Sequence, residues 1–155
     1  MKIFVDADSF PREARLTVEK FSLRTGTPLV YAANHDIPFF EQSPLFTMKL
    51  CSQTEGAADD FIVANATEED IALTRDIPLA ARLVEKKITT LNDRGTVFNR
   101  QNVSEMLEER ELKMQMQNLG IGPKTLSSTY GKKEKSAFAI TLDKILTAKI
   151  RELKK

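Results

Sequence analysis

The sequence predicts an α/β fold with a central, mostly parallel sheet of about five strands. Short apolar runs of strand length alternate along the chain with longer segments of helical periodicity, an order typical of parallel sheets whose crossovers are helices. Two of these runs are followed by aspartate and then by a proline that suits the first turn of a helix. The chain has 155 residues, 41% of them hydrophobic, so we expect one domain over residues 1–155 with a sizeable core.

Five segments are predicted as strands. Residues 3–5 and 71–73 are apolar throughout, which is typical of strands buried on both faces of a parallel sheet. Residues 29–34 form a second buried strand. Residues 46–51 alternate between apolar and polar side chains and are predicted as a more peripheral strand. A short final strand is expected at residues 88–91.

Helices are predicted between and after these strands. The first spans residues 12–24, the next follows Gly56 over residues 57–66, and a third begins at Pro78. A polar helix begins at Asn102 or Ser104 and ends near residue 117. Residues 126–133 are predicted as a mobile polar loop. The last helix covers about residues 134–153, because six apolar residues share one of its faces: Phe138, Leu142, Ile145, Leu146, Ile150 and Leu153.

Four aspartates mark a candidate site. Asp6 and Asp8 follow the first strand, Asp76 follows the strand at 71–73, and Asp59 lies in the first turn of the helix at 57–66. Ligands of open α/β sheets bind beyond the carboxyl ends of the strands. If the first and fourth strands are neighbours, these acids meet there. Carboxylates with few basic neighbours favour Mg²⁺ or Mn²⁺, and a pair of such ions can assist phosphodiester cleavage.

The same acids also have a purely structural interpretation. Asp8 or Ser9 is placed to cap the helix at 12–24, and Asp76 is placed to cap the helix that follows it. Asp59 would complement a helix dipole in the first turn of its own helix. Spacing alone does not decide between caps and a metal site, and it does not separate a nuclease from a phosphatase.

Composition limits the partners. A formal net charge of +1 gives no global basic signal, so contact with RNA or DNA would need a local patch, for which Arg75, Arg94 and Lys132 are the candidate phosphate contacts. The single histidine, His35, excludes a multi-histidine zinc site. The single cysteine excludes an intramolecular disulfide and favours a reducing compartment. With neither a membrane-length apolar stretch nor a signal-peptide pattern, we expect a cytoplasmic protein without a membrane partner.

A series of short motifs carries a resemblance over nearly the whole chain. The motifs are Val5-Asp6-Ala7-Asp8 with Pro11, Ala33-Asn34, Ala58-Asp59 with Ile62-Val63, Asp70, Thr74-Arg75-Asp76-Ile77-Pro78-Leu79-Ala80-Ala81, Leu91-Asn92, Arg94-Gly95, Gly122-Pro123, and Phe138 with Leu142. The segment at 74–81 is the most specific. With these motifs the chain resembles the YaiI/YqxD family of small uncharacterised bacterial proteins, which is related to PIN-like nuclease domains.

The resemblance implies a PIN-like three-layer α/β/α fold. It also implies that Asp6, Asp59 and Asp76 match the acidic positions that bind divalent metal in PIN nucleases, and Asp8 fits the family's own Asp-Ala-Asp signature. The sequence departs from the family pattern at several positions. Ser9-Phe10 stands where Ala-Cys is usual, which excludes thiol chemistry there. Asp93 replaces a proline, which puts another acid near the crevice.

Three functions follow from these observations. The first is a nuclease or phosphodiesterase dependent on Mg or Mn, in which Asp6, Asp59 and Asp76 hold the metal and Asp8 orients the site. The second is a non-catalytic module that binds nucleic acid or a protein and keeps the acids for structural reasons. The third is a phosphatase with Asp6 as nucleophile and Asp8 as acid. The catalytic candidates are therefore Asp6, Asp8, Asp59 and Asp76.

Overall fold

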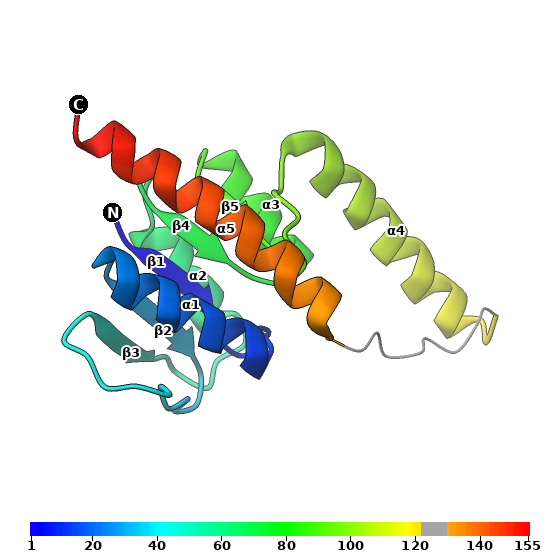
Figure 1. Cartoon of the computed structure of the whole chain (residues 1–155). Coiled ribbons are helices and arrows are strands. Elements are labelled where there is room, and N and C mark those ends of the chain that lie inside the picture. The colour runs from blue at the N-terminus through cyan, green and yellow to red at the C-terminus, as the bar shows by residue number, and fades with distance from the viewer. Residues whose placement is uncertain (122–129) are drawn as a thin grey trace.

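A computed structural model describes residues 1–121 and 130–155 of the chain. Five strands and five helices occur within these residues, in the order β1 (Ile3–Asp6), α1 (Arg12–Thr25), β2 (Leu29–Ala33), β3 (Phe46–Leu50), α2 (Ala57–Asn65), β4 (Ile71–Leu73), α3 (Ile77–Glu85), β5 (Thr89–Leu91), α4 (Arg100–Asn118) and α5 (Lys132–Leu153). The predicted order of strands and helices is confirmed: they alternate as far as β5 except where β3 follows β2 directly, and two helices come after β5 (Figure 1).

The five strands form one sheet in the order β3-β2-β1-β4-β5. Every neighbouring pair is parallel, so the sheet is entirely parallel where a mostly parallel one was expected. β1 is the central strand, with Asp6 opposite Ala32 of β2 and Val5 opposite Leu73 of β4. The first and fourth strands are therefore neighbours, and β3 is an edge strand as predicted.

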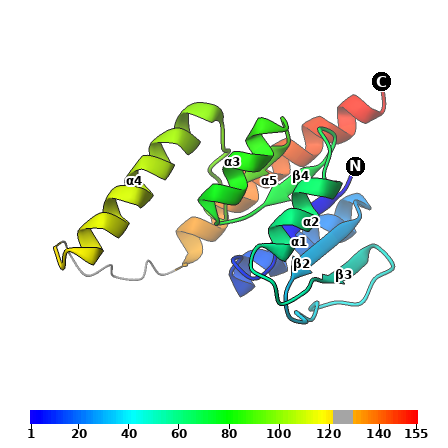
Figure 2. The same cartoon turned by 180° about the vertical axis from the view of Figure 1, so that it is seen from behind.

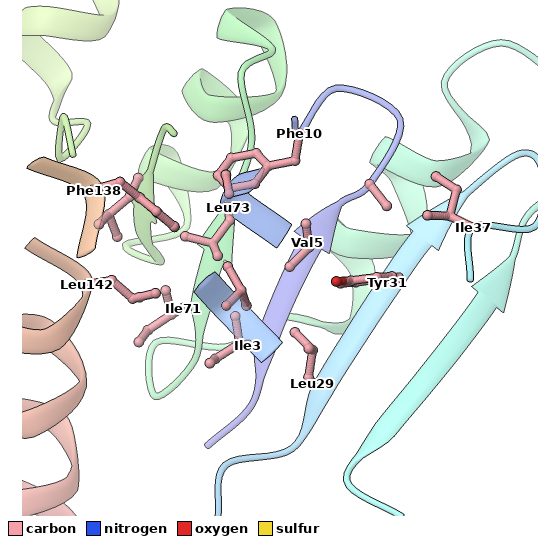
Figure 3. Close-up of a cluster of buried hydrophobic side chains, with 14 of the residues drawn as sticks. Ile3, Val5, Phe10, Leu29, Tyr31, Ile37, Ile71, Leu73, Phe138 and Leu142 are labelled. Carbon is pink, nitrogen blue, oxygen red and sulfur yellow. The ribbon is translucent and has the colours of Figure 1, made fainter. Parts of the chain in front are cut away.

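Helices cover both faces of the sheet, which confirms the three-layer α/β/α architecture. α1 and α5 lie on one face, and α2 and α3 lie on the other (Figures 1 and 2). Ile3 and Val5 point to the first face, where Phe138 and Leu142 of α5 meet them in the cluster shown in Figure 3. Phe4 points to the second face. This burial on both sides is the reason that β1 is apolar at every position before Asp6.

α4 lies outside the three layers and packs on α3 (Figure 2). A small cluster of Ala80, Phe98 and Val103 joins the two helices. α4 begins at Arg100, earlier than the predicted Asn102 or Ser104. The reason is a reciprocal cap: the Asn99 side chain accepts from the Asn102 backbone N–H, and the Asn102 side chain accepts from the Asn99 backbone N–H, each at 2.8 Å. Such a capping box is usually formed with a glutamate or glutamine.

The beginning of α5 also differs from the prediction. α5 starts at Lys132 because the Glu134 carboxylate accepts a hydrogen bond of 3.0 Å from the Gly131 backbone N–H and so caps the helix two residues earlier. Lys132 and Lys133 therefore lie in a helix and not in the predicted loop. The part of that predicted loop at residues 126–129 lies outside the described residues, as do Gly122 and Pro123.

Among the described residues, no helix is long and apolar enough to cross a membrane.

Candidate functional site

The four predicted aspartates line one cavity of about 470 Å³ at the carboxyl edge of the sheet. Asp6 ends β1, Asp8 lies in the loop after it, Asp59 is in the first turn of α2, and Asp76 precedes α3. The parallel sheet brings them together because β1 and β4 are neighbours that end at the same edge. The rest of the lining consists of Ser9, Asn34, Thr54, Glu55, Gly56, Ala57, Ala58, Pro78 and Arg110.

Asp6 is the most buried of the four, with 4% of its surface exposed. Its Oδ2 accepts hydrogen bonds from Thr74 Oγ1 at 2.7 Å and from Ser9 Oγ at 2.8 Å. Burial raises the pKa of Asp6, and the charges of Asp76 and Asp8 add to the increase, although the two hydroxyl donors oppose it. Within the described part of the chain, its Oδ1 receives no hydrogen bond. Asp6 thus presents one free oxygen and a charge that is poorly compensated.

Asp59 and Asp76 complete the acidic side of the cavity. Burial raises the pKa of Asp59 from 3.8 to about 6, and the nearby Asp6 and Asp76 contribute to this increase. Asp76 has a confirmed structural role, because its Oδ1 accepts from the Leu79 backbone N–H at 3.0 Å and caps α3. A cap uses one oxygen of the carboxylate, so the other remains available to a ligand.

Asp8 has a different environment from Asp6, and the expectation that Asp8 or Ser9 caps α1 is wrong. α1 follows Pro11, and no side chain caps its first turn. The Asp8 carboxylate instead contacts the loop after β2, with Oδ1 2.9 Å from His35 Nδ1 and Oδ2 accepting from the Asn34 backbone N–H at 3.2 Å. The lone histidine, predicted as a surface loop residue, is indeed exposed, and it pairs with this aspartate.

Two hydroxyl groups that sequence reasoning did not select support the acids. Ser9 Oγ and Thr74 Oγ1 both donate to Asp6, and Thr74 Oγ1 also accepts from the Asp76 backbone N–H at 2.9 Å. Ser9 Oγ accepts from the Arg75 backbone N–H at 3.1 Å. Thr74 therefore links two of the acids directly. Its place at the end of β4, two residues before Asp76, was the available signal.

The three predicted phosphate contacts are not among the residues that line the cavity. Arg75 Nε lies 3.4 Å from Asp93 Oδ1, and Arg94 pairs with Glu134 at 3.7 Å. Lys132 is exposed in the first turn of α5. Asp93, expected near the crevice, is buried beside Arg75 and does not line the cavity either. Their contact with phosphate remains a prediction.

The cation at the cavity is Arg110 of α4. Sequence reasoning missed it because Arg110 lies in a run of charged residues, and its position depends on how α4 packs against α3. α4 carries the exposed Arg110 side chain to a cavity whose four aspartates all come from earlier segments of the sequence. A guanidinium at this position suits contact with phosphate.

The described residues contain no group of three or more His, Cys, Asp or Glu side chains arranged as a ready-made metal cage. The donor set still suits Mg²⁺, because this ion keeps several water ligands and is usually held by one or two carboxylates together with substrate phosphates. Asp6 Oδ1 is free and the charge of the acids is poorly compensated, as the raised pKa values of Asp6 and Asp59 indicate. The residues present therefore fit such an ion.

The fold and the site define an α/β protein with a three-layer architecture and an acidic cavity at the carboxyl edge of a parallel sheet. Within that class, the chain belongs to the YaiI/YqxD family: the family model described as "Uncharacterized BCR, YaiI/YqxD family" matches residues 4–148. The resemblance drawn from the motifs is thereby confirmed. The family description states no activity.

Bacterial relatives match over almost the full chain. A UPF0178 protein of Treponema denticola is 40% identical over 98% of this chain and 96% of its own length. A UPF0178 protein of Psychromonas ingrahamii is 37% identical over 94% of this chain and 95% of its own length. The corresponding protein of Treponema pallidum is 37% identical over 99% of this chain and 85% of its own length. No solved structure matches the chain.

Proposed function

We propose that this protein is a divalent-metal-dependent phosphodiesterase that cleaves RNA or DNA at the acidic cavity. The observation that carries the proposal is the convergence of Asp6, Asp59 and Asp76, from three separate segments, on one open cavity at the carboxyl edge of the sheet. Acids that serve only as caps do not need to face the same cavity, nor to lie where the charge of Asp76 helps to raise the pKa of Asp6 and Asp59. A bound cation would offset their charge.

In this proposal Asp6 holds Mg²⁺ or Mn²⁺ through its free Oδ1, with Asp59 and Asp76 as the other protein ligands. An ion bound there would supply a nucleophilic water and stabilise the leaving oxygen. Ser9 and Thr74 orient Asp6 through the hydrogen bonds to its Oδ2. Such partners behind a ligand commonly affect metal affinity or activity by about 10–100-fold.

Two further residues act on the substrate side. Arg110 at the rim of the cavity meets the phosphate group with its guanidinium, which offers paired N–H donors. Asp8 stays at the edge, where His35 and the Asn34 backbone hold its carboxylate, and it orients the site without being a metal ligand.

The proposal is tested by incubating the protein with mixed RNA and DNA in the presence of Mn²⁺ or Mg²⁺. Asp6→Asn and Asp76→Asn should each lower cleavage by roughly a hundredfold or more, since they remove proposed ligands themselves and not the residues behind them. Asp76→Asn is the more informative variant because asparagine caps a helix as well as aspartate does.

Asp60→Asn is the matched control. Asp60 neighbours Asp59 in α2, but its side chain is 69% exposed, pairs with Arg82 at 2.9 Å and does not line the cavity. Activity that survives Asp76→Asn unchanged would refute the assignment.

A non-catalytic binding module is the second candidate, favoured by the confirmed cap of Asp76 and by the lack of a ready-made cage among the described residues. It predicts no metal-dependent turnover on any substrate and a loss of stability when Asp6 or Asp76 is changed to alanine. The cleavage assay therefore separates the two candidates.

A further inference from the structure

A second cavity of about 590 Å³ opens beside the acidic one. Asp8 lines both, so the two cavities are adjacent along the same edge of the sheet. The second cavity has a different chemical character, because Arg12 and Arg15 of α1 and the aromatic ring of Phe40 line it. Its other lining residues are Ala7, Phe10, His35, Asp36, Ile37, Pro38 and Phe39.

A buried carboxylate builds this cavity. Glu19 of α1 is fully buried, and its Oε1 accepts hydrogen bonds from the backbone N–H groups of Phe40 at 2.9 Å and Glu41 at 3.2 Å. Its Oε2 accepts from Tyr31 Oη at 2.7 Å. Burying a carboxylate costs free energy unless it is fully hydrogen-bonded, and here the bonds fix the segment around Phe40 against α1. The wall of the cavity is therefore a built feature of the fold.

The two arginines face the ring that Glu19 positions. The guanidinium carbons of Arg12 and Arg15 lie 5.0 and 5.8 Å from the centroid of the Phe40 ring. Arg15 forms no ion pair within the described residues, and its Nε is buried without a hydrogen-bond partner. Arg12 is largely exposed, and its contact with Glu13 is a distant 4.0 Å. Among the described residues, Arg15 is thus held in place without an ion-pair partner, and Arg12 has only its long contact with Glu13.

The surroundings favour an anion rather than another ligand. Arg12 is the first residue of α1, so the cavity lies at the positive end of a helix of 14 residues. Of the two acids in the lining, Asp8 is already paired with His35, and Asp36 is exposed. Guanidinium groups match the oxygens of phosphate in a paired, fork-like geometry. Charged grooves with aromatic rings are a general way to bind single-stranded nucleic acid.

We propose that the cavity of Arg12, Arg15 and Phe40 binds a backbone phosphate of a single-stranded nucleic acid, next to the phosphodiester that occupies the acidic cavity. This inference rests on the proposed function, since it extends the same substrate past Asp8 into the second cavity. The guanidinium groups of Arg12 and Arg15 donate to the phosphate oxygens, and the Phe40 ring keeps both side chains in position.

The experiment measures binding of a fluorescein-labelled single-stranded oligonucleotide by fluorescence anisotropy, in EDTA, over a series of salt concentrations. The double variant Arg12→Met/Arg15→Met should bind at least about tenfold more weakly at low salt, because charge-assisted hydrogen bonds of this kind are among the strong ones. The dependence of log K on log salt should lose about 0.7 for each phosphate contact removed. Methionine preserves the apolar contact with the Phe40 ring.

Arg24→Met is the matched control. Arg24 lies on the same helix and stacks on the Phe21 ring at 4.5 Å, but it pairs with Asp143 and does not line the cavity. It should leave affinity and salt dependence unchanged. Arg12→Met alone guards against misfolding, because the Arg12 side chain is 73% exposed. Arg12→Met alone should also lower the affinity for the oligonucleotide.

Any of the following outcomes would overturn the inference: no binding of the oligonucleotide by the unmodified protein, an unchanged salt dependence in the double variant, or competition by polyglutamate equal to that by unlabelled oligonucleotide. The last would indicate a carboxylate site. Competition by inorganic phosphate, without competition by unlabelled oligonucleotide, would also contradict the inference. The binding measurement contains EDTA and records no cleavage. Its result therefore stands even if the cleavage assay fails, so a failure of this inference can be told apart from a failure of the proposed catalytic role.

Discussion

At the scale of single residues, Asp6 and Asp8 show how far two aspartates two positions apart can differ. Asp6 is buried, receives two hydroxyl donors on one oxygen and has a raised pKa. The side chain of Asp8 is 30% exposed and is paired with His35. Buried, poorly compensated charge is typical of functional sites. Asp6 therefore suits a cation, whereas Asp8 marks the boundary between two cavities.

Asp59 provides a prediction on stability. Its pKa is about 6 instead of 3.8, so the folded state binds more protons than the unfolded state between these values. The contribution of Asp59 to stability is therefore fully present below about pH 4 and is lost as the pH rises through about 6. Asp59→Asn should stabilise the metal-free protein at pH 7 by on the order of 1 kcal/mol, allowing for solvent screening of a partly exposed group. Urea denaturation of the unmodified protein and of Asp59→Asn, at about pH 4 and at about pH 7, measures the difference.

Asp60→Asn serves as the control for that measurement. Asp60 is exposed and pairs with Arg82, so its replacement should change the free energy of unfolding by a few tenths of a kcal/mol or less at either pH. If Asp59→Asn were equally neutral at pH 7, the destabilising effect attributed to the burial of Asp59 and to its repulsion by Asp6 and Asp76 would be disproved.

The acids themselves could be predicted from the sequence, but their partners could not. Asp6 and Asp76 each follow a short apolar strand, and parallel strands end at a common edge, so their convergence needed only the correct strand order. The contact of Asp8 with Asn34 and His35 depends on how the loop after β2 folds, which no local pattern encodes. For the same reason the sequence pointed to a cap on α1 that does not exist.

At the scale of elements, the chain contains two units of strand, acid, proline and helix that end differently. In β4–α3, Asp76 directly precedes the helix and its Oδ1 reaches the Leu79 backbone N–H. In β1–α1, Pro11 occupies the corresponding position and cannot offer a side-chain acceptor. The first unit therefore leaves Asp6 and Asp8 for other contacts, while the second uses one oxygen of Asp76 as a cap.

The observed capping role of Asp76 and its proposed role as a metal ligand can be separated by substitution. Asp76→Ala removes the cap and should lower the free energy of unfolding by about 1 kcal/mol, whereas Asp76→Asn retains the acceptor and should cost only a few tenths. Both should abolish Mn²⁺-dependent cleavage. Thermal melts of the two variants beside cleavage assays measure this. Equal stability of the two variants would show that the cap contributes nothing, and activity retained in Asp76→Asn would show that the charge is not needed.

The contribution of α4 to the site could not be predicted. Val103 in its first turn and Phe98 just before the helix pack against Ala80 of α3, which is distant in sequence. Only this tertiary contact places Arg110 at the acidic cavity. The local pattern of α4 is polar nearly all round, so it gave no packing face on which to orient the helix. The second cavity could not be predicted for the same reason, because it depends on the long-range contact between Glu19 and the Phe40 backbone.

At the scale of the whole molecule, the carboxyl edge of the sheet carries two adjacent cavities, the first lined mainly by acids and the second by two arginines together with Asp8 and Asp36. One holds carboxylates from β1, α2 and the N-terminus of α3, and the other holds arginines from α1. The formal net charge of +1 does not reveal this division. Acidic and basic residues are nearly equal in number, and they differ in where they lie. Acids and arginines that lie next to each other along one edge suit a substrate with neighbouring phosphate groups, one meeting the arginines and the next meeting a cation bound by the acids.

This arrangement predicts that metal binding stabilises the protein more at high pH than at low pH. Protons and Mn²⁺ compete for Asp59, whose pKa is about 6, so affinity should rise as the pH passes through that value. With Mn²⁺ at about a hundred times its Kd, the expected stabilisation of about 2.7 kcal/mol raises the Tm by roughly 5–10 °C at about pH 7.5, and by much less at about pH 5. Melts with and without Mn²⁺ measure both values.

Two variants complete that test. Asp6→Asn should remove the Mn²⁺-dependent shift in Tm at both pH values, because it removes the negative charge of a proposed metal ligand. Asp143→Asn should retain the shift, since Asp143 lies on α5, pairs with Arg24 and does not line either cavity. A shift of the same size at both pH values would mean that the ion binds without displacing a proton from Asp59. A shift that survives Asp6→Asn would place the ion away from the acidic cavity altogether.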